Sequence, residues 1–548
     1  MEQLPHELVE RVCEFLTLDD LKKTLTVSSS FQYASERASG AYAHFDLTRD
    51  NAQQFIDLYN GRRWPYLRHV RFRTQLPPYE EDEQADEADE EPGETHRCRE
   101  SLEERQEKDT LFTDEINFVF STLRTLEHSK LPGNFQLTIY APVREVRGVV
   151  CAHRNCVSWR LHLKNPDALP QLNSVRALSL EDEILIFPLE EERCLQNIDL
   201  RILIDLAEQL PRLEYLGCKV DGGRGWTPDY ESEEAREYLR DWEGPHRDSR
   251  HDFAKALESA TLPSTLRQAQ LDFLHPLSSP ERIDQTIEVP DLVSPAQHDP
   301  FSSSLRLLSY QLRKLELKLV ADASLFWPAD SATSWPNLES VSILFHMSSP
   351  SGRWYFAGPN GDGRDTEGYE VTEASYPPLM DTLAEETLDE EAEDHGFQLS
   401  NVTCNKFRVQ PNDEVLVPFL TAFARAASSM PVLKEACIWT KLRWDASDVE
   451  GYDEDDGTQY AQWPDEPLAW GITFHYSKSR QLWWSTGHWR PDGALRQLFQ
   501  DIGDKTTELI EYWGHERYGE GLPLRPIFDQ FDIFGEPRST SKWPVKAS

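Results

Sequence analysis

The sequence predicts an α/β protein: a short helical module at the N-terminus, then an irregular array of helix–strand units, then a tryptophan-rich C-terminal cap. Three observations lead to this fold class. Apolar residues recur at helical spacing near the N-terminus, and an apolar-Pro-x-Leu segment typical of a turn into a strand recurs along the chain. Seven tryptophans gather between Trp439 and Trp489, which favours a compact cap.

These signals divide the chain into five parts. We expect a helical module at 1–45, a first helix–strand unit at 46–76, an acidic disordered insertion at 77–108, an irregular helix–strand array at 109–440 and a cap at 441–548. Nine of the twelve residues in 80–91 are acidic. Such a segment repels itself and cannot bury enough apolar surface to fold.

The composition limits the classes of function. The net charge of −40, from 96 acidic and 56 basic residues, disfavours nucleic acid as a partner, because phosphate contacts need clustered Lys and Arg. The sequence has no basic–apolar leader and no run of about 18 apolar residues, so we expect neither secretion nor a membrane partner. Eight sparse cysteines fit reduced thiols. We therefore expect a cytoplasmic or nuclear location.

The first predicted helix begins near Pro5, because a first helical turn tolerates the missing N–H of proline. Leu8, Val12, Phe15 and Leu16 follow at i, i+4, i+7 and i+8, the spacing of one apolar helix face. This spacing predicts a short amphipathic helix.

Two more helices are predicted after it. Thr17 and Asp20 are typical of a capping box before a helix that carries Leu21 and Leu25, and Ser28 can cap a third helix. So short a unit buries little apolar surface by itself, so it should need another surface to cover its apolar faces. A helical hairpin packed on its own domain is the alternative.

The order of these residues resembles an F-box over roughly the first 45 residues. The matching positions are Leu-Pro-x-Glu-Leu at 4–8, Val12, Phe15-Leu16, Asp20-Leu21 and Val27-Ser28 up to Phe31. The sequence departs from the pattern at Phe31, where many members have Trp, and at Ser29-Ser30, where a basic pair is usual.

The resemblance implies a docking module for the adaptor subunit of SCF-type cullin–RING ubiquitin ligases. The partners it implies are that adaptor, a cullin reached through it, and a target protein. It also implies that seven residues face the adaptor: Leu4, Pro5, Leu8, Val12, Leu16, Leu21 and Val27.

A repeated segment organises the rest of the chain. The four strict copies are WPYLRHVRF (64–72), LPRLEYLGC (210–218), WPNLESVSI (335–343) and MPVLKEACI (430–438). Looser copies are VRALSL (175–180), LRQAQL (266–271), LRKLEL (312–317) and LSNVTC (399–404). Roughly less than one strict copy is expected by chance, so four indicate a repeat.

The repeated helix and strand resemble a leucine-rich repeat. The copies are unevenly spaced: starts at 67 and 175 lie 108 residues apart, while starts at 312 and 338 lie 26 apart. Regular repeats have ~20–29 residues. We therefore predict a degenerate leucine-rich-repeat-like solenoid with long insertions.

The same pattern predicts a target-binding face. In a strand the apolar positions turn inward and the alternating residues turn outward, so the outward residues should line one continuous sheet face. These residues are Arg71, Ser179, Gly217, Gln270, Glu316 and Ser342. Insertions at 222–250, 275–304 or 357–394 are the alternative place for target binding.

The sequence does not predict catalysis or a cofactor. Cys151, His153 and Cys156 are zinc-ligand types, but a structural site needs four ligands and no second pair follows, so we expect no metal. No phosphate-binding glycine loop, G-x-S-x-G elbow or kinase signature is present. We expect a non-enzymatic substrate receptor. A scaffold that tethers the adaptor outside a ligase, or a carbohydrate-binding module in the tryptophan-rich tail, are the alternatives.

Overall fold

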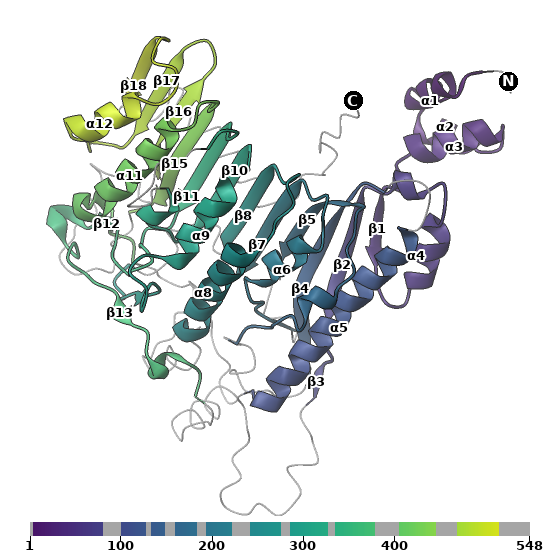
Figure 1. The fold of residues 1–548 in the computed structure, drawn as a ribbon, viewed down its shortest axis with the longest axis horizontal. Helices are drawn as coiled ribbons and strands as arrows, with labels where there is room; N and C mark the ends of the chain where they lie inside the picture. Colours follow the sequence, from purple (N-terminus) through teal and green to yellow (C-terminus); the bar gives the residue numbers. More distant parts are fainter. Residues whose placement is uncertain are drawn as a thin grey trace, which may run out of the picture.

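The computed structural model describes residues 4–80, 100–127, 133–147, 159–182, 193–221, 242–275, 285–326, 335–378, 405–444 and 468–513. Within these segments the chain is a mixed α/β protein with ten α-helices and one large sheet (Figure 1). None of the helices in these segments has both the length and the apolar character needed to cross a membrane.

The N-terminal module consists of helices α1 (His6–Glu14), α2 (Leu18–Thr24) and α3 (Ser29–Ala38). Both predicted caps are confirmed: the Thr17 hydroxyl accepts the Asp20 N–H at 3.3 Å, and the Ser28 hydroxyl accepts the Phe31 N–H at 3.3 Å. These bonds satisfy N–H groups that a helix start leaves unpaired, so the cap residues fix where α2 and α3 begin.

Most strands of the sheet are parallel, and the strands of its main path follow one another in chain order. Its main path is β1 (His44–Leu47), β2 (His69–Gln75), β4 (Phe135–Arg147), β5 (Val175–Glu181), β7 (Tyr215–Asp221), β8 (Gln268–His275), β10 (Lys314–Leu319), β11 (Ser340–Phe345), β15 (Glu435–Leu442), β16 (Leu468–Tyr476), β17 (Arg480–Ser485) and β18 (Leu509–Trp513). Strands β3 (Tyr79–Glu80) and β6 (Arg193–Leu195) pair with β4 off this path. Strand β16 is antiparallel to both neighbours, so the described run of parallel units ends at β15.

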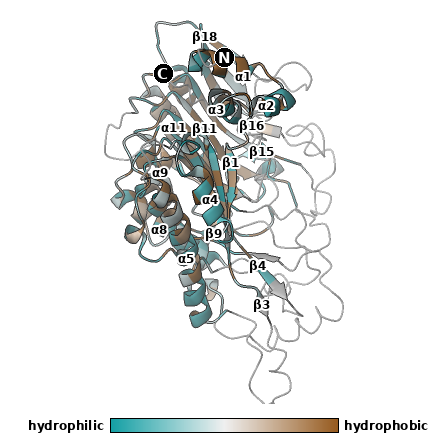
Figure 2. Cartoon of the chain, turned by 90° about the vertical axis from the view of Figure 1, so that its right-hand side faces the viewer, coloured by the Kyte–Doolittle hydropathy of each residue, from teal (hydrophilic) through white to brown (hydrophobic). Residues whose placement is uncertain are grey.

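Helices cover one face of this sheet, as two perpendicular views show (Figures 1 and 2). They are α4 (Ala52–Tyr59), α5 (Leu102–Leu126), α6 (Ile202–Glu208), α8 (Glu243–Ser259), α9 (Pro300–Ser309) and α11 (Asp413–Ser428). Helix α12 (Gly493–Gln500) packs against α11, where Phe423 and Phe499 lie 6.1 Å apart. The core lies between these helices and the sheet, because side chains of a strand alternate between faces.

Several short elements join the main ones. They are the 3-10 turns η1 (Trp64–Tyr66), η4 (Pro166–Ala168), η6 (Ala323–Leu325), η7 (Pro359–Gly361) and η8 (Glu373–Ser375), and the small pairs β9 (Pro290–Asp291) with β13 (Tyr369–Glu370) and β12 (Phe356–Ala357) with β14 (Gln410–Pro411). Arg408 holds the turn around η7, donating to the carbonyl oxygen of Gly363 at 2.7 Å.

The repeated segment forms the entrance to a strand. In each strict copy the Leu is buried and lies two residues before the strand begins: Leu67 before β2, Leu213 before β7, Leu338 before β11 and Leu433 before β15. The looser copies at 266 and 312 have the same offset before β8 and β10. The copy at 399–404 lies outside the described residues.

Two predicted boundaries are wrong. Helix α5 begins at Leu102, inside the predicted disordered insertion, because Ser101 caps it through the Glu104 N–H at 3.1 Å and acidic residues favour a helix N-terminus. The boundary at 441 falls within β15, and one core cluster runs from Leu47 to Ile502. The parts predicted at 46–76, 109–440 and 441–548 therefore share a core, whereas 81–99 lies outside the described residues.

Three tryptophans of the tryptophan-rich region, Trp444, Trp470 and Trp484, belong to this core, whereas Trp439 belongs to a second, small cluster with Leu274, Leu344 and Cys437. Trp439, Trp444, Trp470 and Trp484 are all buried, while Trp463 lies outside the described residues. In this region β16 and β17 form an antiparallel hairpin. Most of the described tryptophans therefore have a structural role in packing.

Candidate functional site

An exposed apolar surface on the N-terminal module is the first candidate site. Twelve large apolar side chains are exposed in the described residues, and eight of them lie between Leu4 and Tyr33. Seven of these eight form what we name the docking surface: Leu4, Leu8, Val12, Phe15, Leu18, Leu25 and Val27. Phe15 is 75% exposed and Leu8 is 52% exposed. This concentration within a short stretch makes the module a candidate interaction site, since single exposed apolar residues are ordinary but groups of them are not.

Helix α1 has two apolar sides, and only one of them folds the module. Val9 and Cys13, at i and i+4, turn inward and are buried, whereas Leu8 and Val12 keep the same spacing one residue earlier and turn outward. Sequence reasoning found the outward pair and missed the inward one. The signal was present, because Val9 and Cys13 also recur at helical spacing.

Of the seven residues predicted to face the adaptor, one is buried and a second is half-buried. Leu21 is 4% exposed and lies in the small core of the module, which also contains Val9, Cys13, Phe31 and Ala34. Leu16 is half-buried and packs against the same core. Pro5, Leu4, Leu8, Val12 and Val27 are exposed, so these five remain available to a partner.

The N-terminal module also carries four ion pairs at its surface. They are Arg11 with Glu14, Lys22 with Asp19, Lys23 with Asp20, and Arg37 with Glu10. The hydrogen bond from Lys23, followed by that from Thr17, holds the pKa of Asp20 below its ordinary value. Exposed pairs of this kind contribute little to stability, so the module is held together by its apolar core rather than by these pairs.

A buried carboxylate joins the module to the sheet. Glu36 is 4% exposed, and it accepts hydrogen bonds from Arg62 at 3.2 Å and from Arg63 at 2.8 Å. The guanidinium groups also stack on aromatic rings, Arg62 over Tyr33 at 4.0 Å and Arg63 over Tyr42 at 4.3 Å. The hydrogen bond to Glu36 raises the pKa of Arg63. The module is thus fixed to the first helix–strand unit by charge and ring stacking.

The second candidate site is a row of residues across the sheet. The strand registers place all six residues predicted to bind the target in one row across the sheet. The row passes through the third residue of β2 and through the residues paired with it in the following strands. In order the row is Asp46, Arg71, Thr138, Ser179, Gly217, Gln270, Glu316, Ser342 and Cys437. We name it the register row. Because Val70 and Phe72 point into the helix-covered core, the register row lies on the opposite face.

Only part of the register row can touch a partner. Arg71, Gln270 and Glu316 keep exposed surface, whereas Ser179, Gly217 and Ser342 are buried. The predicted contact of a target with the side chains of Ser179 and Ser342 is therefore wrong for this structure, and Gly217 offers only backbone. Target binding by the other three stays a prediction.

The accessible members of the register row already have partners. Arg71 lies 2.6 Å from Asp46, and Lys314 lies 2.6 Å from Glu316. The Tyr215 hydroxyl donates to the Gln270 amide oxygen at 2.9 Å, and burial, with Glu316 adding to it, raises the pKa of Tyr215. A partner that binds here must exchange these contacts for its own.

Sequence reasoning missed the next row of the same face. Two residues further along the strands lie Arg73, Tyr140, Glu181, Lys219, Asp272 and Lys318. The signs of charge alternate from Glu181 to Lys318, and Lys318 and Asp272 form a buried ion pair of 3.1 Å. The sequence did carry a signal for this row, because side chains of a strand return to the same face every two residues, the period that also predicted the register row.

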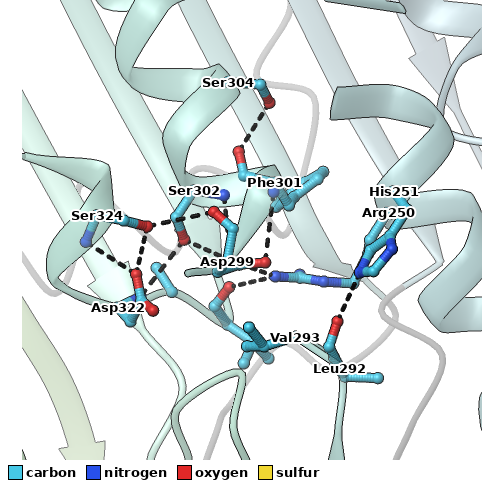
Figure 3. A network of polar contacts seen from close by, with 12 residues as sticks. Arg250, His251, Leu292, Val293, Asp299, Phe301, Ser302, Ser304, Asp322 and Ser324 are labelled. Carbon is cyan, nitrogen blue, oxygen red and sulfur yellow. Dashed lines mark hydrogen bonds and ion pairs between the residues drawn. The ribbon is translucent and has the colours of Figure 1, made fainter. Parts of the chain in front are cut away.

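A third cluster is structural. Asp299 caps α9, accepts Arg250 from α8 at 2.8 Å and accepts the Ser302 hydroxyl at 2.6 Å, while Asp322 caps η6 and accepts Ser324 (Figure 3). Burial, followed by the charge of Asp299, raises the pKa of Asp322. Arg250 is 3% exposed and Asp299 is 0% exposed at the side chain, so no substrate reaches them. The cluster fixes α8, α9 and η6 together.

Metal chemistry has no candidate in the described part of the chain, where no group of three or more His, Cys, Asp or Glu side chains is placed to hold an ion. Cys151, His153 and Cys156 lie outside the described residues. In comparisons with known proteins, no family model matches the chain and no curated protein matches it.

Proposed function

We propose that the chain is a non-catalytic substrate-recognition subunit of an SCF-type ubiquitin ligase. In this proposal helices α1 to α3 are an F-box that binds the adaptor, and the sheet or its insertions bind a target protein. The observation that carries the proposal is the docking surface, because five of its seven side chains occupy F-box positions and all seven are exposed on a module with its own small core. These five are Leu4, Leu8, Val12, Phe15 and Val27.

The energetics favour a protein partner for the docking surface. Fully burying an exposed Leu, Val or Phe contributes about 1.5–3 kcal/mol, so several of them together can drive a stable association. The chain leaves these residues in water, while Val9, Cys13, Leu21 and Phe31 fold the module. An apolar surface that the module does not need for folding is the expected feature of an adaptor-docking unit.

The strand order supports a leucine-rich-repeat-like solenoid for the target-binding part. The strands from β1 to β15 on the main path are parallel and in chain order, and the helices between them lie on one face. Arrays of this kind leave the other sheet face open to a partner, and their long concave surfaces commonly bind proteins.

Catalysis belongs to partner subunits in this proposal. The chain contributes proximity: by holding the target and the ligase together, it makes ubiquitin transfer effectively intramolecular and raises the effective concentration of the target. A scaffold that tethers the adaptor outside a ligase remains the second candidate. A carbohydrate-binding role for the tryptophan-rich region is less favoured, since Trp439, Trp444, Trp470 and Trp484 are buried and cannot stack on a sugar.

Co-purification from cells tests the proposal. We expect Leu8→Asp with Val12→Asp to abolish adaptor binding, because burying an unpaired carboxylate costs several kcal/mol. A matched control is Leu307→Asp with Val432→Asp, two equally exposed residues far along the chain, which should bind the adaptor normally. Normal adaptor binding by the first variant would rule out the F-box assignment. Adaptor without cullin in the purified complex would favour the scaffold.

A further inference from the structure

A hollow of about 470 Å³ lies between segments that are far apart in sequence. Arg105 comes from α5, Trp159 from the segment before η4, Trp242 from the start of α8, and Glu373 and Tyr376 from η8 and the residue after it. Two prolines at 377–378 complete the lining. We name this hollow the aromatic pocket. Its volume lies in the range of sites that hold small ligands or one or two residues of a peptide.

The walls of the aromatic pocket are held in place by specific contacts. The Tyr376 hydroxyl donates to Asp248 at 2.7 Å and accepts from Arg247 at 2.7 Å. Gly244 lies under the Tyr376 ring, where a Cβ atom would come within 2.6 Å of it. The Trp159 ring stacks on Tyr376 with centroids 6.2 Å apart. A ligand would therefore meet a surface that is already ordered, which lowers the entropic cost of binding.

Arg105 supplies a positive charge at the wall of the aromatic pocket. Its guanidinium lies 4.0 Å from the Trp159 ring centroid, and its Nε is buried without an acceptor. Within the described segments the Arg105 side chain makes no hydrogen bond or ion pair, although its backbone N–H donates to Ser101. Burial lowers the pKa of Arg105, although Glu100 and Asp109 oppose this effect.

Three other arginines that stack on aromatic rings differ from Arg105. Arg63, Arg250 and Arg496 each also contact a carboxylate, those of Glu36, Asp299 and Glu511. A guanidinium is a fork of N–H donors that matches a carboxylate, so a half-buried one without an acceptor has capacity for an anionic group.

We propose that the aromatic pocket binds an extended peptide segment that carries a carboxylate next to an aromatic side chain. The carboxylate pairs with Arg105, and the aromatic side chain packs on Trp242, Tyr376 and the two prolines. The inference rests on the proposed function in one respect, that the peptide belongs to the target protein. Glu373 is exposed at the rim and repels the carboxylate, so it limits the affinity.

Calorimetric titration of the full chain with three acetylated peptides tests the inference. The first is Ser-Phe-Asp-Ser amide, the second replaces Asp by Asn, and the third is Ser-Phe with a free terminal carboxylate. We expect the Asp peptide to bind about tenfold more tightly than the Asn peptide, the difference that one charge-assisted hydrogen bond supplies. Tight binding of the third peptide would show that the pocket prefers the carboxylate of a peptide C-terminus, and weak binding would show that it prefers the carboxylate of an Asp side chain.

Variants assign the effect to the pocket. Arg105→Gln should remove the difference between the Asp and Asn peptides, whereas Glu373→Gln should strengthen binding of the Asp peptide. Arg490→Gln is the matched control. The Arg490 guanidinium also stacks on a tryptophan, 4.7 Å from the Trp513 ring centroid, but it does not line the pocket, so this variant should bind all three peptides as the natural chain does. Equal binding of the Asp and Asn peptides, no binding of any peptide at millimolar concentration, or an unchanged preference in Arg105→Gln would overturn the inference.

Two controls separate this inference from the proposed function. The comparison of Asp and Asn peptides on the unaltered chain needs no variant to fold. Adaptor co-purification is then measured for the same preparations. Loss of the peptide preference with normal adaptor binding tells against the pocket alone, and normal peptide binding without adaptor binding tells against the F-box assignment alone.

Discussion

The Glu36 carboxylate accepts hydrogen bonds from two nitrogen atoms of Arg63, at 2.8 and 3.3 Å, at the junction between the three-helix module and the sheet. Glu36 is buried at the C-terminal half of α3, and Arg63 lies just before η1. A bidentate pair fixes both distance and angle. The direction in which the docking surface faces, relative to the register row, therefore depends on this pair and on Arg62.

Replacing Glu36 by Gln should loosen the module without unfolding the sheet. Removing one partner of a buried pair is costly, but both arginines are partly exposed, so we expect a loss of about 1–3 kcal/mol. Hydrogen exchange should speed up in α1 to α3 and stay unchanged in α5. Glu10→Gln, which removes an exposed pair with Arg37, is the control and should have little effect. Unchanged exchange in α3 of Glu36→Gln would show that the junction does not depend on the pair.

Leu21 and Leu8 should behave in opposite ways. Leu21→Ala removes a buried side chain from the small core of the module, so we expect a loss of about 2–4 kcal/mol in the stability of α1 to α3, measured by hydrogen exchange. Leu8→Ala removes an exposed side chain and should leave that exchange unchanged while weakening adaptor binding. If the two variants had the same effect on stability, the division between core and docking surface would be incorrect.

The features that sequence reasoning predicted correctly depend on local chemistry. Thr17 and Ser28 mark helix starts because a hydroxyl must satisfy nearby N–H groups. Leu67 and Leu213 mark strand entrances because the N–H of each closes the preceding turn by donating to the carbonyl oxygen three residues earlier. The alignment of Arg71 with Glu316 follows from the fixed period of a strand. Each of these signals lies within a few residues of the feature it predicts.

The features that sequence reasoning missed depend on tertiary contacts. Leu21 fits an outward position in a helix as well as an inward one, and only packing with Phe31 and Cys13 turns it inward. The burial of Ser179 and Ser342 likewise depends on neighbouring side chains, such as Glu181, which accepts the Ser179 hydroxyl at 2.6 Å, and the period of a strand does not specify these contacts. The aromatic pocket joins Arg105 to Tyr376 across 271 positions (376 − 105), so no local pattern indicates it.

Reversing the charges of the register row tests its role in target capture. Arg71→Glu with Glu316→Arg disrupts the contacts with Asp46 and Lys314, but surface changes usually alter stability by under ~0.5 kcal/mol. We expect normal adaptor binding and slower turnover of the proteins that accumulate when residues 4–38 are deleted. Quantitative proteomics identifies the proteins that accumulate in the deletion variant and measures their turnover in the charge-reversed variant. Normal turnover here, together with lost turnover after deleting one insertion, would move target recognition from the sheet to that insertion.

His69 should make the stability of the sheet depend on pH. Burial, followed by the charge of Arg71, lowers the pKa of His69 from 6.5 to about 4, and the Thr138 hydroxyl lies 2.8 Å from its Nε2. The folded chain therefore keeps His69 neutral at a pH where the unfolded chain protonates it. The stabilisation is present above pH 6.5 and is lost as the pH falls from 6.5 to 4, by about 2–3 kcal/mol in total.

Urea unfolding at pH values of about 7 and about 4.5 should show a smaller loss of stability for His69→Gln than for the natural chain. His44→Gln, at the exposed position paired with His69 in β1, is the control and should lose as much stability as the natural chain. An equal loss in His69→Gln and the natural chain would show that His69 is protonated in both states.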